Sequence, residues 1–296
     1  MIRLLILLTG LASLILIGGA ITLGRLLPRG TEIAYVSSQG QKPAIYRMDM
    51  NRLLTARITD PHSGAYSPAW SPDGERIAFY SDRNGNRDLY VMDAEGRNIQ
   101  QLTRDHGSND GAAWSPDGEQ IAFHSDDAND YNIYILNLKD GSLHRLLEND
   151  LFWDANPSWS PDGKRLIFVS TREELNENVF IVDIDGSHIR RLTDNPAQDY
   201  GPKWSPDGEQ IVFVARDVHT GNLWVHVMDA DGRNIRSLGS SRTVDQTPSW
   251  SPDGKQIVFA SVSGGDFDLF LMDADGRNVR PLTDNHADDW APVWRP

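Results

Sequence analysis

A five-residue string, WSPDG, recurs along the chain and constrains its fold more than any other feature. The copies begin at Trp70, Trp114, Trp159, Trp204 and Trp250, and a truncated copy, WRP, begins at Trp294. Successive tryptophans are therefore 44 to 46 residues apart. A repeat of ~40–45 residues with four strands in each copy is the period of a β-propeller, in which each blade buries the faces of its neighbours.

Each repeat has the pattern of four short strands. Between Trp70 and Thr103 the first strand is predicted over residues 68–70, the second over 76–81, the third over 89–93 and the fourth over 98–103. Pro72-Asp73-Gly74 forms a tight turn after the first strand, because Pro presets its backbone angle and Gly takes a left-handed conformation. Apolar residues on both faces of the middle strands indicate sheets covered on both sides, as propeller blades are.

The two ends of the repeat region complement each other. The first repeat, over residues 31–60, lacks its own Trp strand, whereas the last copy, Trp294-Arg295-Pro296, is a Trp strand with nothing after it. The two fragments make one blade. We therefore predict an all-β, six-bladed propeller over residues 28–296, in which the C-terminal strand closes the ring and leaves no open sheet edge.

An uncharged stretch precedes the propeller. Residues 4–24 are mostly Leu and Ile, and the stretch is long enough to span a bilayer as one helix. The alternative is a cleaved signal peptide, with Arg3 before the apolar run and Gly18-Gly19-Ala20 as a small-residue cleavage site. We favour retention because the apolar run continues past that site, and we assign residues 1–27 to a membrane anchor or signal segment. Arg3 precedes the span whereas Arg25 and Arg29 follow it, so the positive-inside rule does not support export of the propeller and weakly opposes it.

The charge balance excludes some partners. The formal net charge is −14, from 28 basic and 42 acidic residues. The first 30 residues hold three Arg and no acidic residue, so the propeller itself is more acidic still. Such a surface repels nucleic-acid backbones and anionic lipid headgroups, and it favours divalent cations or basic protein surfaces. The absence of Cys excludes disulfides, Cys-ligated zinc and thiol catalysis.

One position in the repeat is a candidate site. Five residues before each Trp, near the mouth of the predicted central channel, stand Ala65, Asn109, Asp154, Asp199, Asp245 and Asp289. Four carboxylates converging with one amide on one axis would concentrate negative potential, and oxygen ligands suit Ca²⁺ or Mg²⁺. We therefore predict a partner-binding funnel at Asn109, Asp154, Asp199, Asp245 and Asp289, with Ca²⁺ at the four Asp as an option. The alternative is structural, with each Asp bonding nearby backbone amides and shaping its loop.

Other patterns carry less weight. His62, His106 and His286 each lie eight residues before a Trp, which admits a shared metal site, although His residues on separate exposed loops are commonly tolerated substitutions. The repeated Trp residues are interpreted as core packing. No G-x-S-x-G, H-E-x-x-H or P-loop motif is present, so we predict a binding or scaffold protein and not an enzyme. The alternative is a polysaccharide lyase or lactone hydrolase with a divalent metal in the channel.

The WSPDG copies, with following strands such as IAFYSDRNGNRDLYVMDAEG, resemble the WD40-like repeats of the TolB propeller family over about residues 31–296. This resemblance implies an extracytoplasmic propeller that binds a protein or peptide at its central funnel, anchored at a membrane or secreted if the N-terminal segment is cleaved. We expect a monomer. TolB itself carries an α/β domain before its propeller, for which there is no room here, so TolB's own partners are not carried over. Fold does not dictate function.

Overall fold

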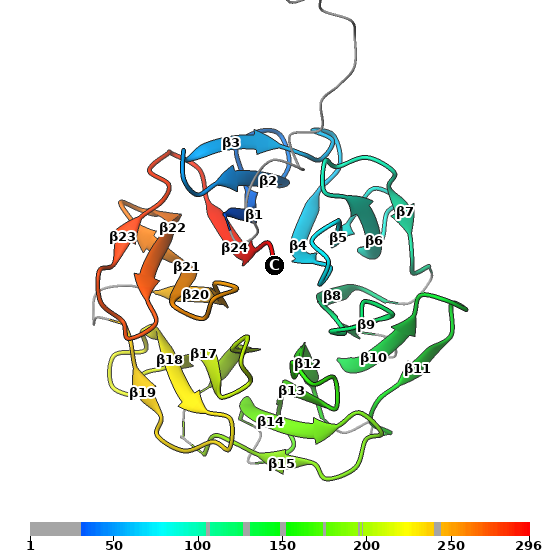
Figure 1. Cartoon of the computed structure of the whole chain (residues 1–296), viewed down its shortest axis with the longest axis vertical. Helices are drawn as coiled ribbons and strands as arrows, with labels where there is room; N and C mark the ends of the chain where they lie inside the picture. The colour runs from blue at the N-terminus through cyan, green and yellow to red at the C-terminus, as the bar shows by residue number, and fades with distance from the viewer. Residues whose placement is uncertain are drawn as a thin grey trace, which may run out of the picture.

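The computed structural model describes residues 31–104, 107–126, 131–148, 152–173, 176–194, 196, 198–239 and 244–296. Within these residues the chain forms six four-stranded antiparallel sheets, arranged as blades around a central channel (Figure 1). The all-β, six-bladed propeller expected from the repeat is confirmed. This described part contains no helix long and apolar enough to cross a membrane. The predicted anchor or signal segment, residues 1–27, lies outside it.

Each blade runs from an innermost strand beside the channel to a short outermost strand. The innermost strands are β4 (Ala65–Trp70), β8 (Asn109–Trp114), β12 (Asp154–Trp159), β16 (Asp199–Trp204), β20 (Asp245–Trp250) and β24 (Asp289–Trp294). The second strands are β1 (Glu32–Ser37), β5 (Arg76–Ser81), β9 (Gln120–Ser125), β13 (Arg165–Ser170), β17 (Gln210–Arg216) and β21 (Gln256–Ser263). The third strands are β2 (Ala44–Asp49), β6 (Asp88–Asp93), β10 (Asn132–Asn137), β14 (Asn178–Asp183), β18 (Leu223–Asp229) and β22 (Asp266–Asp273). The outermost strands are β3 (Leu54–Arg57), β7 (Gln100–Gln101), β11 (Leu143–Arg145), β15 (Arg190–Arg191), β19 (Arg236–Ser237) and β23 (Arg280–Pro281).

The first blade contains strands from opposite ends of the described chain. Its order is β24-β1-β2-β3, and β1 pairs with β24 on one side and with β2 on the other. Ile33 lies opposite Trp294, and Ser37 lies opposite Asp289. The prediction that the C-terminal strand completes the first blade is therefore confirmed.

A buried carboxylate reinforces this closure. Glu32, at the start of β1, is only 4% exposed. One of its oxygens lies 2.6 Å from Nη1 of Arg295, and the other lies 3.2 Å from Nη2 of Arg47. Because a buried carboxylate is stable only when it is paired and hydrogen-bonded, this cluster favours the closed ring.

The ring has two different faces. The long-loop face carries the loops that precede each innermost strand and the loops that join the second and third strands; the turn face carries the PDG turns. In one PDG turn the hydroxyl of Ser115 donates to Asp117 at 2.6 Å, and the amide of Glu119 donates to the same oxygen at 2.9 Å. Both bonds hold the pKa of the Asp117 carboxyl below its usual value. The Asp residues of these turns are therefore structural.

The apolar core lies between adjacent blades, where the repeated tryptophans pack. Trp114, for example, joins a cluster with Tyr80 of the preceding blade and Phe123 of its own blade. Its indole nitrogen donates to the carbonyl oxygen of Ala69 at 3.1 Å. The six repeat Trp side chains are at most 8% exposed, which agrees with their interpretation as packing residues.

Three strands differ in their bounds from those predicted, and the smallest difference is that β6 begins at Asp88 instead of residue 89. Strand β4 begins at Ala65 instead of residue 68, because a bulge at Ser67 allows the strand to continue through Pro68. Strand β7 covers only Gln100–Gln101, because Asn98, at φ 55°, still belongs to the preceding turn.

Candidate functional site

The third residue of each innermost strand lines the channel. These residues are Ser67, Gly111, Asn156, Gly201, Thr247 and Ala291. Their φ angles all lie between 46° and 69°, and the pairing with the second strand shifts register beside each of them. Each is therefore a β-bulge, which bends the strand and re-aims its side chain. We call these six residues the bulge row.

The predicted ring lies at the first residue of each innermost strand, and its side chains are buried inside the blades. Its polar members, Asn109, Asp154, Asp199, Asp245 and Asp289, are 0–1% exposed. None of the five lines the channel cavity that the bulge row surrounds. Their role in binding a partner stays a prediction.

The bonds of these side chains hold adjacent strands together. Asp154 accepts two hydrogen bonds from Nη2 of Arg172, at 2.8 and 3.0 Å. Asp245 accepts one from the hydroxyl of Ser261 at 2.9 Å. These contacts support the structural alternative, although the partners include side chains of the same blade and not only backbone amides of the loop.

Three members of the ring also connect a blade to the one before it, and one of them, Asp245, accepts from the backbone amide of Val225 in β18 at 3.4 Å. Asn109 donates to the carbonyl oxygen of Arg87 and to the hydroxyl of Thr103, both at 3.2 Å. Asp289 accepts from the amide of Asn285 at 2.7 Å. Burial raises the pKa of the Asp289 carboxyl, against the opposing effect of its hydrogen-bond donors.

The candidate metal sites are not assembled in the part of the chain that the structure describes. There, no three His, Asp or Glu side chains lie close enough to share a metal ion, and this applies to the four Asp considered for Ca²⁺. The four Asp side chains are buried and do not line the channel cavity. His62 and His286 are exposed, and His106 lies outside the described residues.

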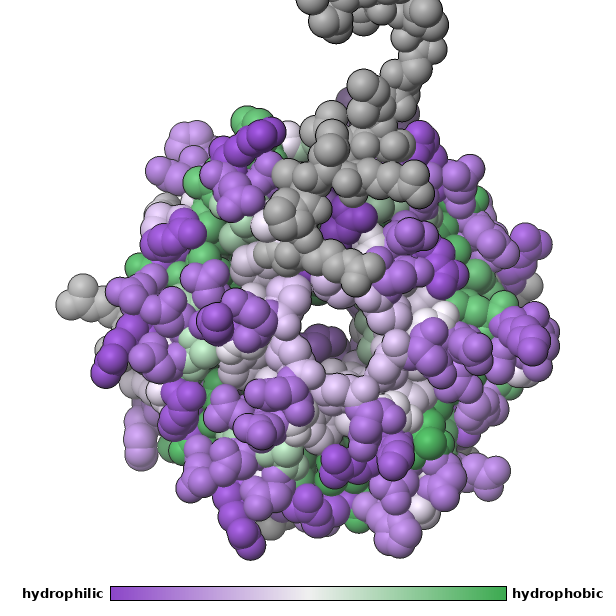
Figure 2. Space-filling model, viewed as in Figure 1, coloured by the Kyte–Doolittle hydropathy of each residue, from purple (hydrophilic) through white to green (hydrophobic). Residues whose placement is uncertain are grey.

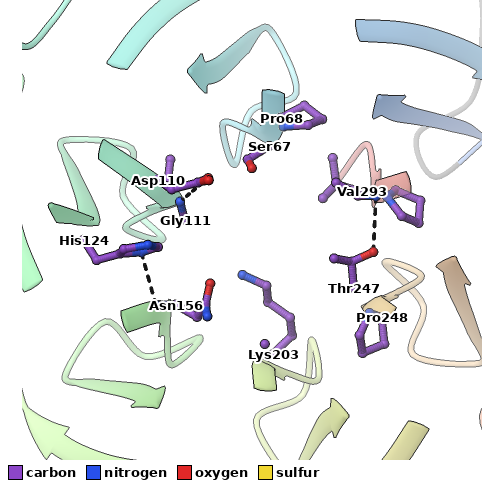
Figure 3. A pocket seen from close by; sticks show the side chains of 14 residues that line it. Ser67, Pro68, Asp110, Gly111, His124, Asn156, Lys203, Thr247, Pro248 and Val293 are labelled. Carbon is purple, nitrogen blue, oxygen red and sulfur yellow. Dashed lines mark hydrogen bonds between the residues drawn. The ribbon is translucent and has the colours of Figure 1, made fainter. Parts of the chain in front are cut away.

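A cavity of about 240 Å³ lies inside the bulge row, toward the long-loop face. Prolines that follow the row, including Pro68, Pro248 and Pro292, form part of its wall. Among its described lining residues, only Asp110, His124 and Lys203 can titrate (Figure 3). Toward the turn face a second cavity, of about 480 Å³, is lined by the Trp and Pro residues of the repeats, and Lys203 lines it as well. The ring is open at its centre (Figure 2).

Hydrogen bonds from neighbouring strands orient two of these three groups. Asp110 is the second residue of β8; it accepts from the amide of Gly111 at 2.8 Å and pairs with Nη1 of Arg87 at 3.3 Å. His124 lies in β9, and its Nδ1 accepts from the amide of Asn156 at 3.3 Å. Burial is the main cause that lowers the pKa of His124, so its imidazole is neutral at pH 7.

Lys203 is the residue before Trp204 in β16, and its amine points toward the channel centre (Figure 3). Burial lowers the pKa of this amine to about 8, although the nearby Asp110 carboxylate acts in the opposite direction. The amine of Lys203 forms no hydrogen bond or ion pair with the side chains that the structure describes.

Sequence reasoning missed all three of these groups. The signal that could have found them is a break in the repeat. The equivalents of Lys203 in the other blades are Ala69, Ala113, Ser158, Ser249 and Val293. A charged residue that replaces small or apolar ones in a single copy is not needed by the repeat, and it therefore identifies a position with another role.

A row of aromatic rings connects the cavity to the long-loop face. His124 contacts Tyr131 edge-on, with ring centroids 5.4 Å apart, and Tyr131 contacts Trp153 in the same way at 5.5 Å. Trp153 is 49% exposed. At the equivalent position the other five repeats have Gly64, Ser108, Gln198, Val244 and Asp288. This position varies from repeat to repeat, and Trp153 is the one aromatic residue among the six.

Comparison with known proteins supports the propeller fold that the sequence repeat predicts and the ring of blades shows. The profile of the TolB β-propeller domain matches residues 21–156 and 151–296. The chain belongs to the TolB β-propeller family. The resemblance predicted from the WSPDG repeats is therefore confirmed.

Among solved structures, TolB from Acinetobacter baumannii is similar to this TolB-family chain at 25% identity and a TM-score of 0.81, over 90% of this chain and 67% of that one. A putative TolB from Agrobacterium tumefaciens is 23% identical, with a TM-score of 0.73 over 90% of this chain and 99% of that one. An oligogalacturonate lyase in complex with manganese, at 17% identity and a TM-score of 0.57 over 87% and 74%, shares the fold alone. No curated protein sequence matches the chain.

Proposed function

We propose that this chain is an interaction module that binds a segment of a partner protein at the long-loop end of its channel. One observation carries the proposal: Lys203 is a charged cavity residue where the other five repeats have small or apolar residues, and one row of rings connects the cavity to the exposed Trp153. Residues that recur in each blade hold the propeller together. Residues particular to one blade are free to serve binding, and Trp is among the residue types enriched at binding hot spots.

We further propose that residues 1–27 hold the propeller, as a monomer, at the extracytoplasmic face of a membrane. The placement of β1 supports this arrangement. The strand begins at the turn face, because Ile33 lies opposite Trp294 at the end of β24. A membrane anchor before residue 31 therefore leaves the long-loop face directed away from the bilayer and accessible to a partner.

Site-specific photo-crosslinking tests the proposed binding face. A photoreactive amino acid replaces Trp153 in the full-length protein, expressed in its own cells. The control carries the same amino acid at Leu54, which is 63% exposed at the start of β3, near the turn face. We expect a discrete protein adduct from position 153 and none from position 54. Adducts from position 54 alone, equal adducts from both, or none from position 153 would contradict the proposal.

The second candidate function is catalysis in the channel. Three titratable groups, two of them with shifted pKa values, face one cavity, and such clusters occur at active sites. A lyase or lactone hydrolase that uses a divalent metal is the enzyme class to test. Metal-dependent turnover of uronate polymers or lactones that is lost in His124→Gln would replace the interaction proposal. We expect no turnover by either protein.

A further inference from the structure

The channel cavity has an unusual charge balance for such an acidic protein. Of its two ionised lining groups, the Asp110 carboxylate is neutralised by Arg87, whose guanidinium lies 3.3 Å away. Arg87 is itself held over the ring of Tyr66, at 4.5 Å from the centroid. A neighbouring cation therefore already offsets the Asp110 charge. This leaves the Lys203 ammonium as a positive charge without a direct partner among the described lining residues.

The neutral part of the wall can complete a site for a small anion. Ser67 and Thr247 offer hydroxyl groups and Asn156 offers an amide, all from the bulge row around the cavity. Gly111 leaves room there, because a Cβ atom at this position would approach Nδ1 of His124 to 2.7 Å. The prolines and Val293 supply an apolar wall against which an aliphatic stem can pack.

Size and long-range charge select the kind of anion. A cavity of about 240 Å³ is below the ~300–1,000 Å³ of sites for drug-sized ligands, so it admits one side chain or one chain terminus. A nucleic acid or an anionic membrane would bring many negative charges against a protein of net charge −14. A single carboxylate on an otherwise neutral or basic segment meets far less repulsion.

We propose that Lys203 binds a carboxylate of the partner, either an Asp or Glu side chain or a C-terminus, inserted into the channel from the long-loop face. This inference rests on the proposed function and adds the chemistry of the ligand. A charge-assisted hydrogen bond gives specificity, since an amide oxygen in place of the carboxylate can still accept from the ammonium but leaves its charge uncompensated.

The test uses a display library of random decapeptides, selected against the immobilised full-length chain in detergent. Lys203→Ser is the matched variant, because Ser158 and Ser249 occupy the equivalent position in two other blades, so the blade tolerates serine. We expect the wild-type protein to enrich peptides with a required Asp, Glu or C-terminal carboxylate. Conversion of that carboxylate to its amide should weaken binding by about 10- to 100-fold for the wild type and leave binding to Lys203→Ser unchanged.

Lys203→Glu provides the reverse test, since it should select peptides with Lys or Arg at the same position. Wild-type peptides without a required carboxylate, or a carboxylate requirement that persists in Lys203→Ser, would overturn the inference and leave the interaction module standing. Failure of the wild-type chain to select any peptide would overturn the proposed function and the inference with it. Circular dichroism of both variants verifies that the propeller is folded.

Discussion

At the residue scale, the repeat separates side chains that build the propeller from side chains that depart from it. Ser115 and Asp117 have counterparts in each PDG turn, and their bonds could be anticipated from the motif. Lys203 has no counterpart. Its position in the cavity depends on how the strands bend around the channel, and no local sequence pattern predicts that bending.

The titration of Lys203 gives the first prediction. Its pKa is about 8 in the folded chain and 10.5 in an unfolded one, so the unfolded state binds more protons between these pH values. The stability of the wild type should therefore rise with pH across this window, whereas that of Lys203→Ser should not. The groups that face the amine are Asp110, paired with Arg87, and the neutral His124.

We expect Lys203→Ser to exceed the wild type by about 1–2 kcal/mol in free energy of unfolding at pH 7. The difference should shrink toward pH 10. Urea unfolding of both proteins at pH 7, 8.5 and 10 measures it, and the shared tyrosine titrations cancel in the comparison. A gap that stays constant or widens with pH would contradict the burial of a charged amine.

At the element scale, the bulge row explains what the sequence predicted of the channel and what it did not. In a regular strand the first, third and fifth residues share a face, so the recurrent carboxylates at the first position are natural candidates for the channel wall. The bulge interrupts this alternation. Gly111, Gly201 and Asn156 are residue types that favour a left-handed backbone, but Ser67 and Ala291 are not. The sequence therefore did not predict the bulge.

The bulge row yields a prediction on stability. Ala291 adopts φ 51°, where a Cβ atom costs ~1–2 kcal/mol, and glycine already fills two equivalent positions. We expect Ala291→Gly to raise the free energy of unfolding by about 1 kcal/mol. Ala113 is the control: it also lies on an innermost strand but is not among the residues with positive φ. Ala113→Gly should lower stability by ~0.5–1 kcal/mol. Equal effects of the two substitutions in urea unfolding would exclude the left-handed strain.

At the scale of the whole molecule, ring closure could be predicted because the first and last repeats are complementary fragments. The side chains that reinforce it could not, because Glu32 and Arg295 belong to no motif and meet only when the ring is complete. Their separation of 263 residues makes this contact a direct probe of the closed ring.

We expect Glu32→Gln to lower the free energy of unfolding by about 2–3 kcal/mol, because Arg47 and Arg295 then lose the charge that compensates their partial burial. The control is Arg277→Ala, which removes a salt bridge to Asp275 between largely exposed side chains. It should change stability by less than ~0.5 kcal/mol. Both values come from urea unfolding near pH 7. A loss for Glu32→Gln no larger than that of the control would show that the buried cluster adds nothing to closure.

The position of β1 also has a mechanical consequence. Because it lies between β24 and β2, it is hydrogen-bonded along both edges. A force applied at residue 31, away from the turn face, acts along the axis of this strand. It must shear two hydrogen-bonded ladders at once instead of unzipping one edge, bond by bond. If a membrane holds that end and a partner pulls on the opposite face, the blade that closes the ring is also the one that resists the load.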